Sequence, residues 1–172
     1  PNANYFGPDS FGFSVVDSNG LSNSYTVSLT VQPVNDAPVT VNTTLVVNEE
    51  DAVVLLGAGV TDADPGDSLT ITVTGLPTSG LGEVQLGGIA VTVGQQLTTA
   101  QLAQLSYLAP LDYDGLTPAG AFTYVASDGL LSTPGQIVID LRPLNDAPVN
   151  TVPGAQTVAE DQALVFSAAN GN

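Results

Sequence analysis

Carboxylates are the only abundant side chains in this sequence that can do chemistry. Seventeen of the 172 residues are acidic, Arg142 is the one basic residue, and His, Cys and Lys are absent. That composition excludes a Ser-His-Asp triad, a thiolate nucleophile, a Schiff-base lysine and an ordinary zinc site. The chemistry that remains for carboxylate oxygens is chiefly the binding of hard divalent cations such as calcium.

The acidic residues gather in short segments rich in turn-forming residues. These segments are Glu49–Asp51, Asp62–Asp67, Asp112–Asp114, Asp128–Gly129 and Asn145–Asp146. Asp and Asn favour turns for conformational reasons, so solvated turn residues are one interpretation. Cation binding is the other. Acids that meet at one end of a domain, with no lysine to pair with, repel one another, and a bound divalent cation would offset that repulsion.

An internal repeat organises the chain. Pro33–Val39 returns as Pro143–Val149, 110 residues later. We therefore expect the C-terminal part of one repeat in 1–36, a complete repeat in 37–146, and the N-terminal part of the next in 147–172. Such a chain would be a piece of a longer tandem array, and its incomplete ends would need covering by their own repeats or by neighbouring copies.

The periodicity inside the repeat is that of β-strands. Apolar residues alternate with hydroxyl and other small residues in Leu69–Val73 and Phe122–Ala126, which is typical of half-buried strands. Thr98 and Gln101 are spaced as a capping box and predict one short helical turn near 99–104. About seven strands in one repeat indicate an all-β, immunoglobulin-like Greek-key sandwich. The strands are expected near 43–48, 52–57, 68–74, 83–86, 89–93, 105–108, 121–127 and 134–142.

The acidic motifs resemble those of cadherin repeats and follow the same order along the chain. Asp62–Asp64 is identical to the cadherin Asp-Ala-Asp, and Leu111–Asp114 resembles Leu-Asp-x-Glu. Ala126–Gly129 resembles the Ala-x-Asp that ends the sixth cadherin strand, and Asn145–Pro148 is similar to the end of the cadherin linker. Glu50 stands where that family has its early glutamate.

The fuller resemblance is to bacterial cadherin-like tandem repeats of giant, type I-secreted (RTX-type) adhesins. It rests on the linker Asn145–Val149, on the turn 97–102 and on the segment Tyr5–Phe11 ahead of a strand. The resemblance covers essentially the whole chain. It implies tandem cadherin-like sandwiches with calcium at each junction between consecutive repeats.

The resemblance also implies which residues hold the calcium. At the first junction the ligands would be Asn35, Asp36, Asp62, Asp64 and Asp128. At the second junction they would be Glu50, Asp112, Asp114, Asn145 and Asp146. Glu50–Asp51 is matched to Glu160–Asp161 at the same repeat offset. The chain departs from the cadherin pattern at the first linker position, where Pro33 and Pro143 replace an aspartate, and Asp67 receives no ligand role.

The favoured function is a calcium-rigidified extracellular spacer repeat of a large bacterial surface adhesin or filament that supports cell adhesion. The alternative is a ligand-binding module for carbohydrate or protein, although aromatic residues make up only 6% of the chain and Trp is absent. An enzyme is not expected, because a two-carboxylate glycosidase needs its acids in one cleft, whereas the repeat puts them near linkers.

The expected partners follow from the same composition. Neighbouring repeats of the same chain, and copies of the chain in a filament, are the candidates. A lone Arg142 cannot form a basic patch for nucleic acid, and no apolar run is long enough for insertion into a membrane. We expect an extracellular location, at the cell surface or secreted, in which metal ions replace the missing disulfides.

Overall fold

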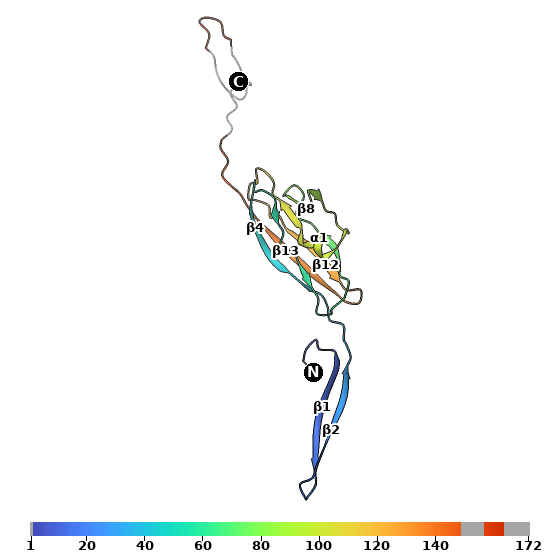
Figure 1. Cartoon of the computed structure of the whole chain (residues 1–172). Helices are drawn as coiled ribbons and strands as arrows, with labels where there is room; N and C mark the ends of the chain where they lie inside the picture. Colours follow the sequence, from blue (N-terminus) through green and yellow to red (C-terminus); the bar gives the residue numbers. More distant parts are fainter. Residues whose placement is uncertain (1, 149–156, 164–172) are drawn as a thin grey trace.

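The structure is a computed structural model that describes residues 2–148 and 157–163. Figure 1 shows the hairpin of β1 and β2 beyond one end of a β-sandwich. In chain order the elements are β1 (Gly7–Val16), β2 (Ser22–Val31), β3 (Val39–Thr40), β4 (Asn42–Asn48), β5 (Val54–Leu55), β6 (Val60–Thr61), β7 (Thr70–Gly75), β8 (Glu83–Leu86), β9 (Ile89–Ala90), β10 (Gln96–Leu97), α1 (Thr99–Ala103), β11 (Leu105–Leu108), β12 (Ala121–Ser127) and β13 (Ser132–Arg142).

Two sheets face each other in the sandwich. One has five strands in the order β10-β7-β12-β13-β4, and the other has four in the order β5-β11-β8-β9. The short strands β3 and β6 pair with each other. Strands β4 and β13 run parallel over seven residue pairs, and the other pairings are antiparallel. This arrangement confirms the predicted all-β, immunoglobulin-like sandwich.

Strand β12 shows how the alternating sequence builds the core. Phe122, Tyr124 and Ala126 are fully buried, while the residues between them are partly exposed. Ile137 and Ile139 repeat this pattern on the neighbouring β13. Because successive side chains of a strand point to opposite faces, both strands direct their apolar residues to the space between the sheets.

Two buried tyrosines connect this core to the surrounding loops. The hydroxyl of Tyr124 donates a hydrogen bond to the carbonyl oxygen of Gly59 at 2.7 Å. The hydroxyl of Tyr107 donates to the carbonyl oxygen of Leu81. Burial raises the pKa of Tyr107 to about 12, so this hydroxyl stays protonated and able to donate well into the alkaline range.

The predicted helical turn is confirmed in position and in its cap. Helix α1 begins after Thr98, whose hydroxyl accepts from the backbone N–H of Gln101 at 3.2 Å. The Gln101 side-chain oxygen accepts in return from the backbone N–H of Thr98 at 2.9 Å. Leu102, on the inner face, is fully buried. The two reciprocal bonds of a capping box therefore fix the start of this single turn.

The expected strands agree with the structure where the alternation is long. The ranges 83–86, 105–108 and 121–127 coincide with β8, β11 and β12. The ranges 52–57 and 89–93 contain only the two-residue strands β5 and β9, and β3, β6 and β10 have no predicted counterpart. Two residues are too few to show a period, so these short strands leave no pattern in the sequence.

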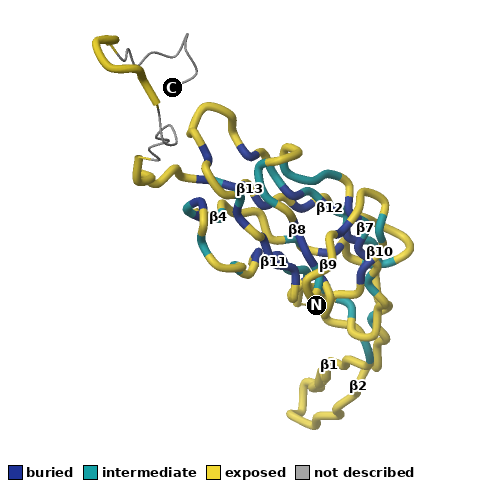
Figure 2. Tube along the Cα trace, turned by 90° about the horizontal axis from the view of Figure 1, so that it is seen from above, coloured by how far each residue is buried: buried dark blue, intermediate teal, exposed yellow. Residues whose placement is uncertain are grey.

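The hairpin repeats the pairing of β12 and β13. Phe11 lies opposite Val27 and Phe13 opposite Tyr25, just as Phe122 lies opposite Ile137. The difference is burial: Phe11 is 53% exposed and Phe122 is 0% exposed. Figure 2 shows the buried positions in the sandwich and the exposed hairpin. The division at 1–36, 37–146 and 147–172 stays a prediction, and much of its last part (149–156, 164–172) lies outside the described residues.

The close contact of Gly135 with Tyr124 generates the first prediction. A Cβ at Gly135 would lie 2.3 Å from the ring of Tyr124, so Gly135→Ala must displace that ring. We expect a loss of about 1–3 kcal/mol in the free energy of unfolding, measured by urea denaturation. Gly12→Ala is the control, since its Cβ would make an ordinary contact at 3.6 Å. Equal effects of the two substitutions would contradict the packing argument.

The exposed face of the hairpin generates the second prediction. Phe11 and Phe13 lie on one face of a two-stranded sheet that no third strand of the described residues extends. Burying each of these exposed side chains is worth about 1.5–3 kcal/mol. The double substitution Phe11→Ser and Phe13→Ser should therefore reduce self-association of the full chain in sedimentation velocity, at unchanged sandwich stability. Leu130→Ser, at a position outside the hairpin that is 79% exposed, is the control. Unaltered association in the double variant would contradict the prediction.

Candidate metal centres

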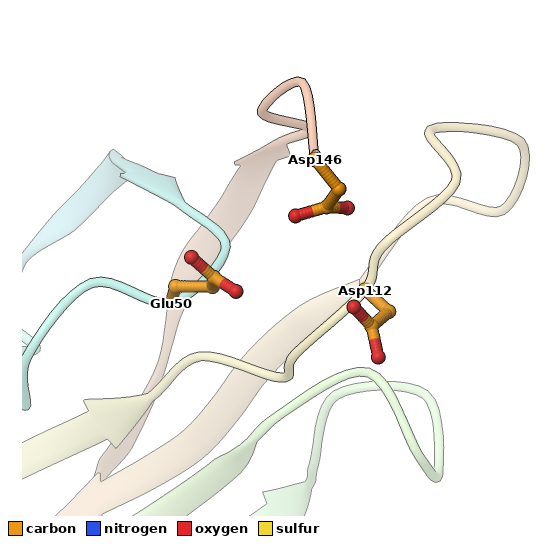
Figure 3. A group of neighbouring side chains, drawn as sticks. All are labelled: Glu50, Asp112 and Asp146. Carbon is orange, nitrogen blue, oxygen red and sulfur yellow. The ribbon is translucent and has the colours of Figure 1, made fainter. Parts of the chain in front are cut away.

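Three carboxylates meet at the end of the sandwich where the chain leaves β13. Oxygen atoms of Glu50, Asp112 and Asp146 lie within 4.8 Å of one another, and all three residues are exposed. Figure 3 shows their carboxylates turned toward a common space. Glu50 follows β4, Asp112 follows β11 and Asp146 follows β13, so the ends of three strands supply one oxygen-lined group. We call it the upper group.

Two further residues were predicted for this end, and they have other contacts. The carboxylate of Asp114 accepts a hydrogen bond from the backbone N–H of Leu116 at 3.0 Å, and Asp114 is not among the three grouped acids. The side-chain nitrogen of Asn145 donates to the carbonyl oxygen of Asp146 at 3.2 Å. Asn145 thus steadies the backbone at Asp146, while Asp114 stabilises the turn that follows it.

A fully buried carboxylate, Glu49, lies beside the upper group and was not among the predicted site residues. It is 0% exposed and accepts hydrogen bonds from the backbone N–H groups of Tyr113 and Leu144. Both donors lie next to predicted ligands, at Asp112 and Asn145. The side chain is therefore part of the structure of this end, although its sequence neighbour Glu50 carries the exposed carboxylate.

The turn geometry corrects the repeat alignment at this point. Glu50 has φ 60° and Asp161 has φ 64°, and each is the second residue of a turn. The turn bonds match too, from Asp51 N–H to Asn48 O at 3.4 Å and from Gln162 N–H to Ala159 O at 3.3 Å. Glu160 thus corresponds to Glu49, one residue earlier than expected. A valine two residues before each glutamate, Val47 and Val158, is the sequence signal for this alignment.

A second carboxylate group lies at the opposite end of the sandwich, where the linker from the hairpin arrives. Oxygen atoms of Asp62, Asp67 and Asp128 lie within 4.8 Å of one another. Asp62 and Asp128 were predicted, and Asp67 was not. Gly66 adopts φ +103° between them, a conformation that lets the chain turn back and bring Asp67 to the group. We call it the lower group.

In the lower group, one buried carboxylate oxygen lacks a hydrogen-bond donor among the described residues, and the neighbouring negative charges repel one another. Asp62 Oδ1 accepts from the backbone N–H of Asp64 at 3.0 Å, but the buried Oδ2 has no hydrogen-bond partner among the described residues. Desolvation, followed by the charges of Asp62, Asp64 and Asp128, raises the pKa of Asp67. A buried carboxylate oxygen without a donor is costly unless a ligand satisfies it.

The linker is hydrogen-bonded directly to this end. The side-chain nitrogen of Asn35 donates to Asp128 Oδ2 at 2.9 Å, and the backbone N–H of Asp36 donates to Asp64 Oδ2 at 2.7 Å. Hydrogen bonds from the backbone N–H of Leu131, from Asn35 and from the backbone N–H of Leu130 lower the pKa of Asp128. All five residues predicted for the first junction therefore lie together, with Asp67 added.

Both groups consist of carboxylates, and no basic side chain of the described residues lies beside either of them. The single basic residue, Arg142, is paired with Asp140 at 3.0 Å and so serves neither group. Calcium takes six to eight oxygen ligands in flexible geometry, whereas magnesium demands a tighter octahedron and keeps its waters. The oxygen ligands of both groups and the unpartnered Asp62 Oδ2 fit calcium.

Among the described residues no helix is long and apolar enough to cross a membrane.

The sequence of residues 35–140 matches the family described as bacterial Ig domain. No curated protein shows significant similarity to the chain. Among solved structures, the endo-fucoidan hydrolase MfFcnA4 from glycoside hydrolase family 107 is 22% identical, with a TM-score of 0.39 over 83% of this chain and 20% of its own. The endo-fucoidan hydrolase MfFcnA9 is 22% identical, with a TM-score of 0.35 over 81% of this chain and 22% of its own.

These structures contradict one expectation. Both are glycoside hydrolases, so the prediction that the protein is not an enzyme is withdrawn. The chain spans about a fifth of the length of these hydrolases, and at this TM-score no substrate or catalytic residue carries over to it.

The match to the family model carries more weight than these structures. It spans residues 35–140, which is more than half of the chain, and it coincides with the sandwich from the linker after β2 to β13. The chain therefore belongs to the bacterial Ig domain family.

Proposed function

We propose that this chain is a calcium-rigidified, cadherin-like repeat module of a large, type I-secreted bacterial adhesin or filament. Bacterial Ig-like domains are typical of surface and extracellular proteins, which supports a repeat module in such a protein. The observation that carries the calcium proposal is the orphaned Asp62 Oδ2 within a group of three acids beside a linker. The module would support cell adhesion from outside the cell.

Each carboxylate group would join a linker to one end of the sandwich. In the lower group Asp62, Asp67 and Asp128 would bind the ion, with Asn35, Asp36 and Asp64 beside them. In the upper group Glu50, Asp112 and Asp146 would bind it, with Asp114 and Asn145 close in sequence. A bound calcium ion supplies positive charge that offsets the repulsion within each group. The linkers would then lose freedom to bend, which stiffens an array of repeats.

The proposed partners are neighbouring repeats. The hairpin has the register of β12 and β13, and in the sandwich that face is covered by the opposite sheet. Its exposed side chains Phe11, Phe13 and Tyr25 would be covered in the same way by the rest of a similar unit, or by copies of the chain in a filament.

A ligand-binding module is the second candidate, and one observation favours it. An open cavity of about 530 Å³ lies at the edge of the sandwich, lined mainly by apolar residues such as Leu76, Val84 and Val91. Glu83 is the one charged residue in this lining. The test is a glycan array probed with the full chain and with Val91→Trp, which would fill the cavity. Glycan binding by the wild type that is lost in the variant would favour this candidate over a spacer role.

Chelation tests the calcium proposal directly. Removing calcium from the full chain should lower the melting temperature, because a site at 100-fold excess of ligand over its dissociation constant stabilises by about 2.7 kcal/mol. The measurement is differential scanning calorimetry with calcium and with EGTA, and a magnesium sample serves as the control. Identical melting curves in calcium and EGTA would rule out the proposed function.

Asp67→Asn should have opposite effects with and without calcium. The raised pKa of Asp67 means that its ionised form costs folding stability, a cost fully present at neutral pH and relieved as pH falls through the raised pKa. In EGTA the variant should therefore melt at a higher temperature than the wild type. In calcium titrations it should bind about tenfold or more weakly, since a neutral amide oxygen replaces a charged carboxylate ligand.

The control for this prediction is Glu83→Gln, which removes an equal charge from an exposed strand residue that belongs to neither group. It should change neither the melting temperature in EGTA nor the calcium affinity. Weakened calcium binding in the control, or unaltered binding in Asp67→Asn, would contradict a ligand role for Asp67.

A further inference from the structure

We propose that Glu49 is the positioning residue of the upper group, holding its three ligand-bearing segments in place without itself binding the ion. This inference rests on the proposed calcium function and deepens it. The resemblance to cadherin repeats implied that Glu50 holds the position of the early glutamate. The structure assigns the two neighbouring glutamates different tasks: Glu50 exposes its carboxylate to the group, and Glu49 is 0% exposed.

The contacts of Glu49 reach both of the other segments. Its Oε1 accepts from the backbone N–H of Leu144 at 2.6 Å, and its Oε2 accepts from the backbone N–H of Tyr113. Tyr113 directly follows Asp112, and Leu144 stands two residues before Asp146. Since Glu50 is the next residue along the chain, one carboxylate lies at the point where all three segments converge.

Backbone hydrogen bonds complete the same frame. The N–H of Glu49 donates to the carbonyl oxygen of Arg142 at 2.9 Å, and the N–H of Glu50 donates to that of Pro110 at 3.0 Å. These bonds hold the turn against the segments that precede Tyr113 and Leu144. The buried carboxylate then fixes the next residues of both segments, because hydrogen bonds to an ionised acceptor are stronger than neutral ones.

Removing the Glu49 charge should therefore loosen the ligands while the core stays intact. Each carboxylate oxygen is engaged by an N–H group, and the side chain is fully shielded, so Glu49 acts through Asp112 and Asp146. A glutamine in its place would present an N–H₂ group to one of the two backbone donors and leave that donor unpaired. Partners that orient metal ligands typically contribute about 10–100-fold to metal affinity.

The test uses the full chain with Glu49→Gln and the control Asp51→Asn. Asp51 lies on the same turn, and among the described residues its carboxylate accepts only from the backbone N–H of Asn48, at 2.8 Å. Its substitution removes the same charge. Calcium titration followed by NMR resolves the upper and lower groups separately. Amide hydrogen exchange in EGTA reports on the N–H groups of Tyr113 and Leu144 without any metal.

In Glu49→Gln we expect calcium binding at the upper group to weaken about 10–100-fold, with the lower group unchanged. Exchange at Tyr113 or Leu144 should accelerate in EGTA, and Asp51→Asn should leave both measurements at wild-type values. If Glu49→Gln fails to fold, Glu49→Asp replaces it: the charge remains, but the shorter side chain cannot reach both donors, and the same two changes are expected.

Several outcomes would overturn the proposal. Wild-type affinity at the upper group in a folded Glu49 variant would do so, as would an equal loss at both groups, which indicates general destabilisation. Unchanged amide hydrogen exchange at both Tyr113 and Leu144 in the Glu49 variant would show that the Glu49 carboxylate does not hold these two segments. If the wild type bound no calcium at either group, the proposed function would fail, and the exchange experiment would still show whether Glu49 holds the two segments.

Discussion

The antiparallel pairing of β12 with β13 is the constraint on which the rest of the structure depends. Its seven residue pairs place Phe122 and Tyr124 against the core, and the flanking strands β7 and β4 pair with its two outer edges. The same pair also sets the positions of the carboxylate groups. Asp128 lies in the turn that joins the two strands, and Asp146 follows the far end of β13. The length of β13 therefore fixes the separation of the two groups.

Charge is the second determinant, and it acts against folding at both ends of that pair. A chain with 17 acidic residues and one basic residue cannot neutralise its carboxylates with ion pairs. Backbone N–H groups take over part of this task, as at Glu49, Asp64 and Asp128. At Asp62 and Asp67 that compensation is incomplete. The carboxylates that backbone donors leave uncompensated are the ones that a divalent cation would stabilise most.

The hairpin shows that register and burial are separate properties of the same sequence pattern. Phe11 and Phe13 alternate as Phe122 and Tyr124 do, and they form the corresponding cross-strand pairs. Local alternation and a turn suffice to set this register, because a slip of one residue would move every apolar side chain of a strand to the other face of the sheet. Burial needs a second sheet, which the hairpin does not have among the described residues. The exposed apolar face is thus a property of the hairpin's surroundings, not of its strands.

The sequence by itself determined the features that are encoded over a few neighbouring residues. The alternation in 121–127, the capping box of Thr98 and Gln101, and the clustering of acids in turns all predicted what the structure contains. It also predicted which acids share an end, since the resemblance to cadherin-like repeats grouped Asp62 with Asp128 and Glu50 with Asp112. These signals are local, or are ordered along the chain, and so they survive in the sequence.

Only the tertiary structure decided which of two adjacent glutamates is buried and whether Asp67 joins the lower group. Glu49 meets its donors across 64 and 95 residues of chain. The valine that aligns it with Glu160 does not reveal that its carboxylate is buried or which donors it meets. Asp67 reaches Asp62 through a backbone reversal at Gly66, and it reaches Asp128 only because β7 pairs with β12. Contacts between distant segments depend on the packing of the whole sandwich, and a pattern read within a single segment carries no record of them.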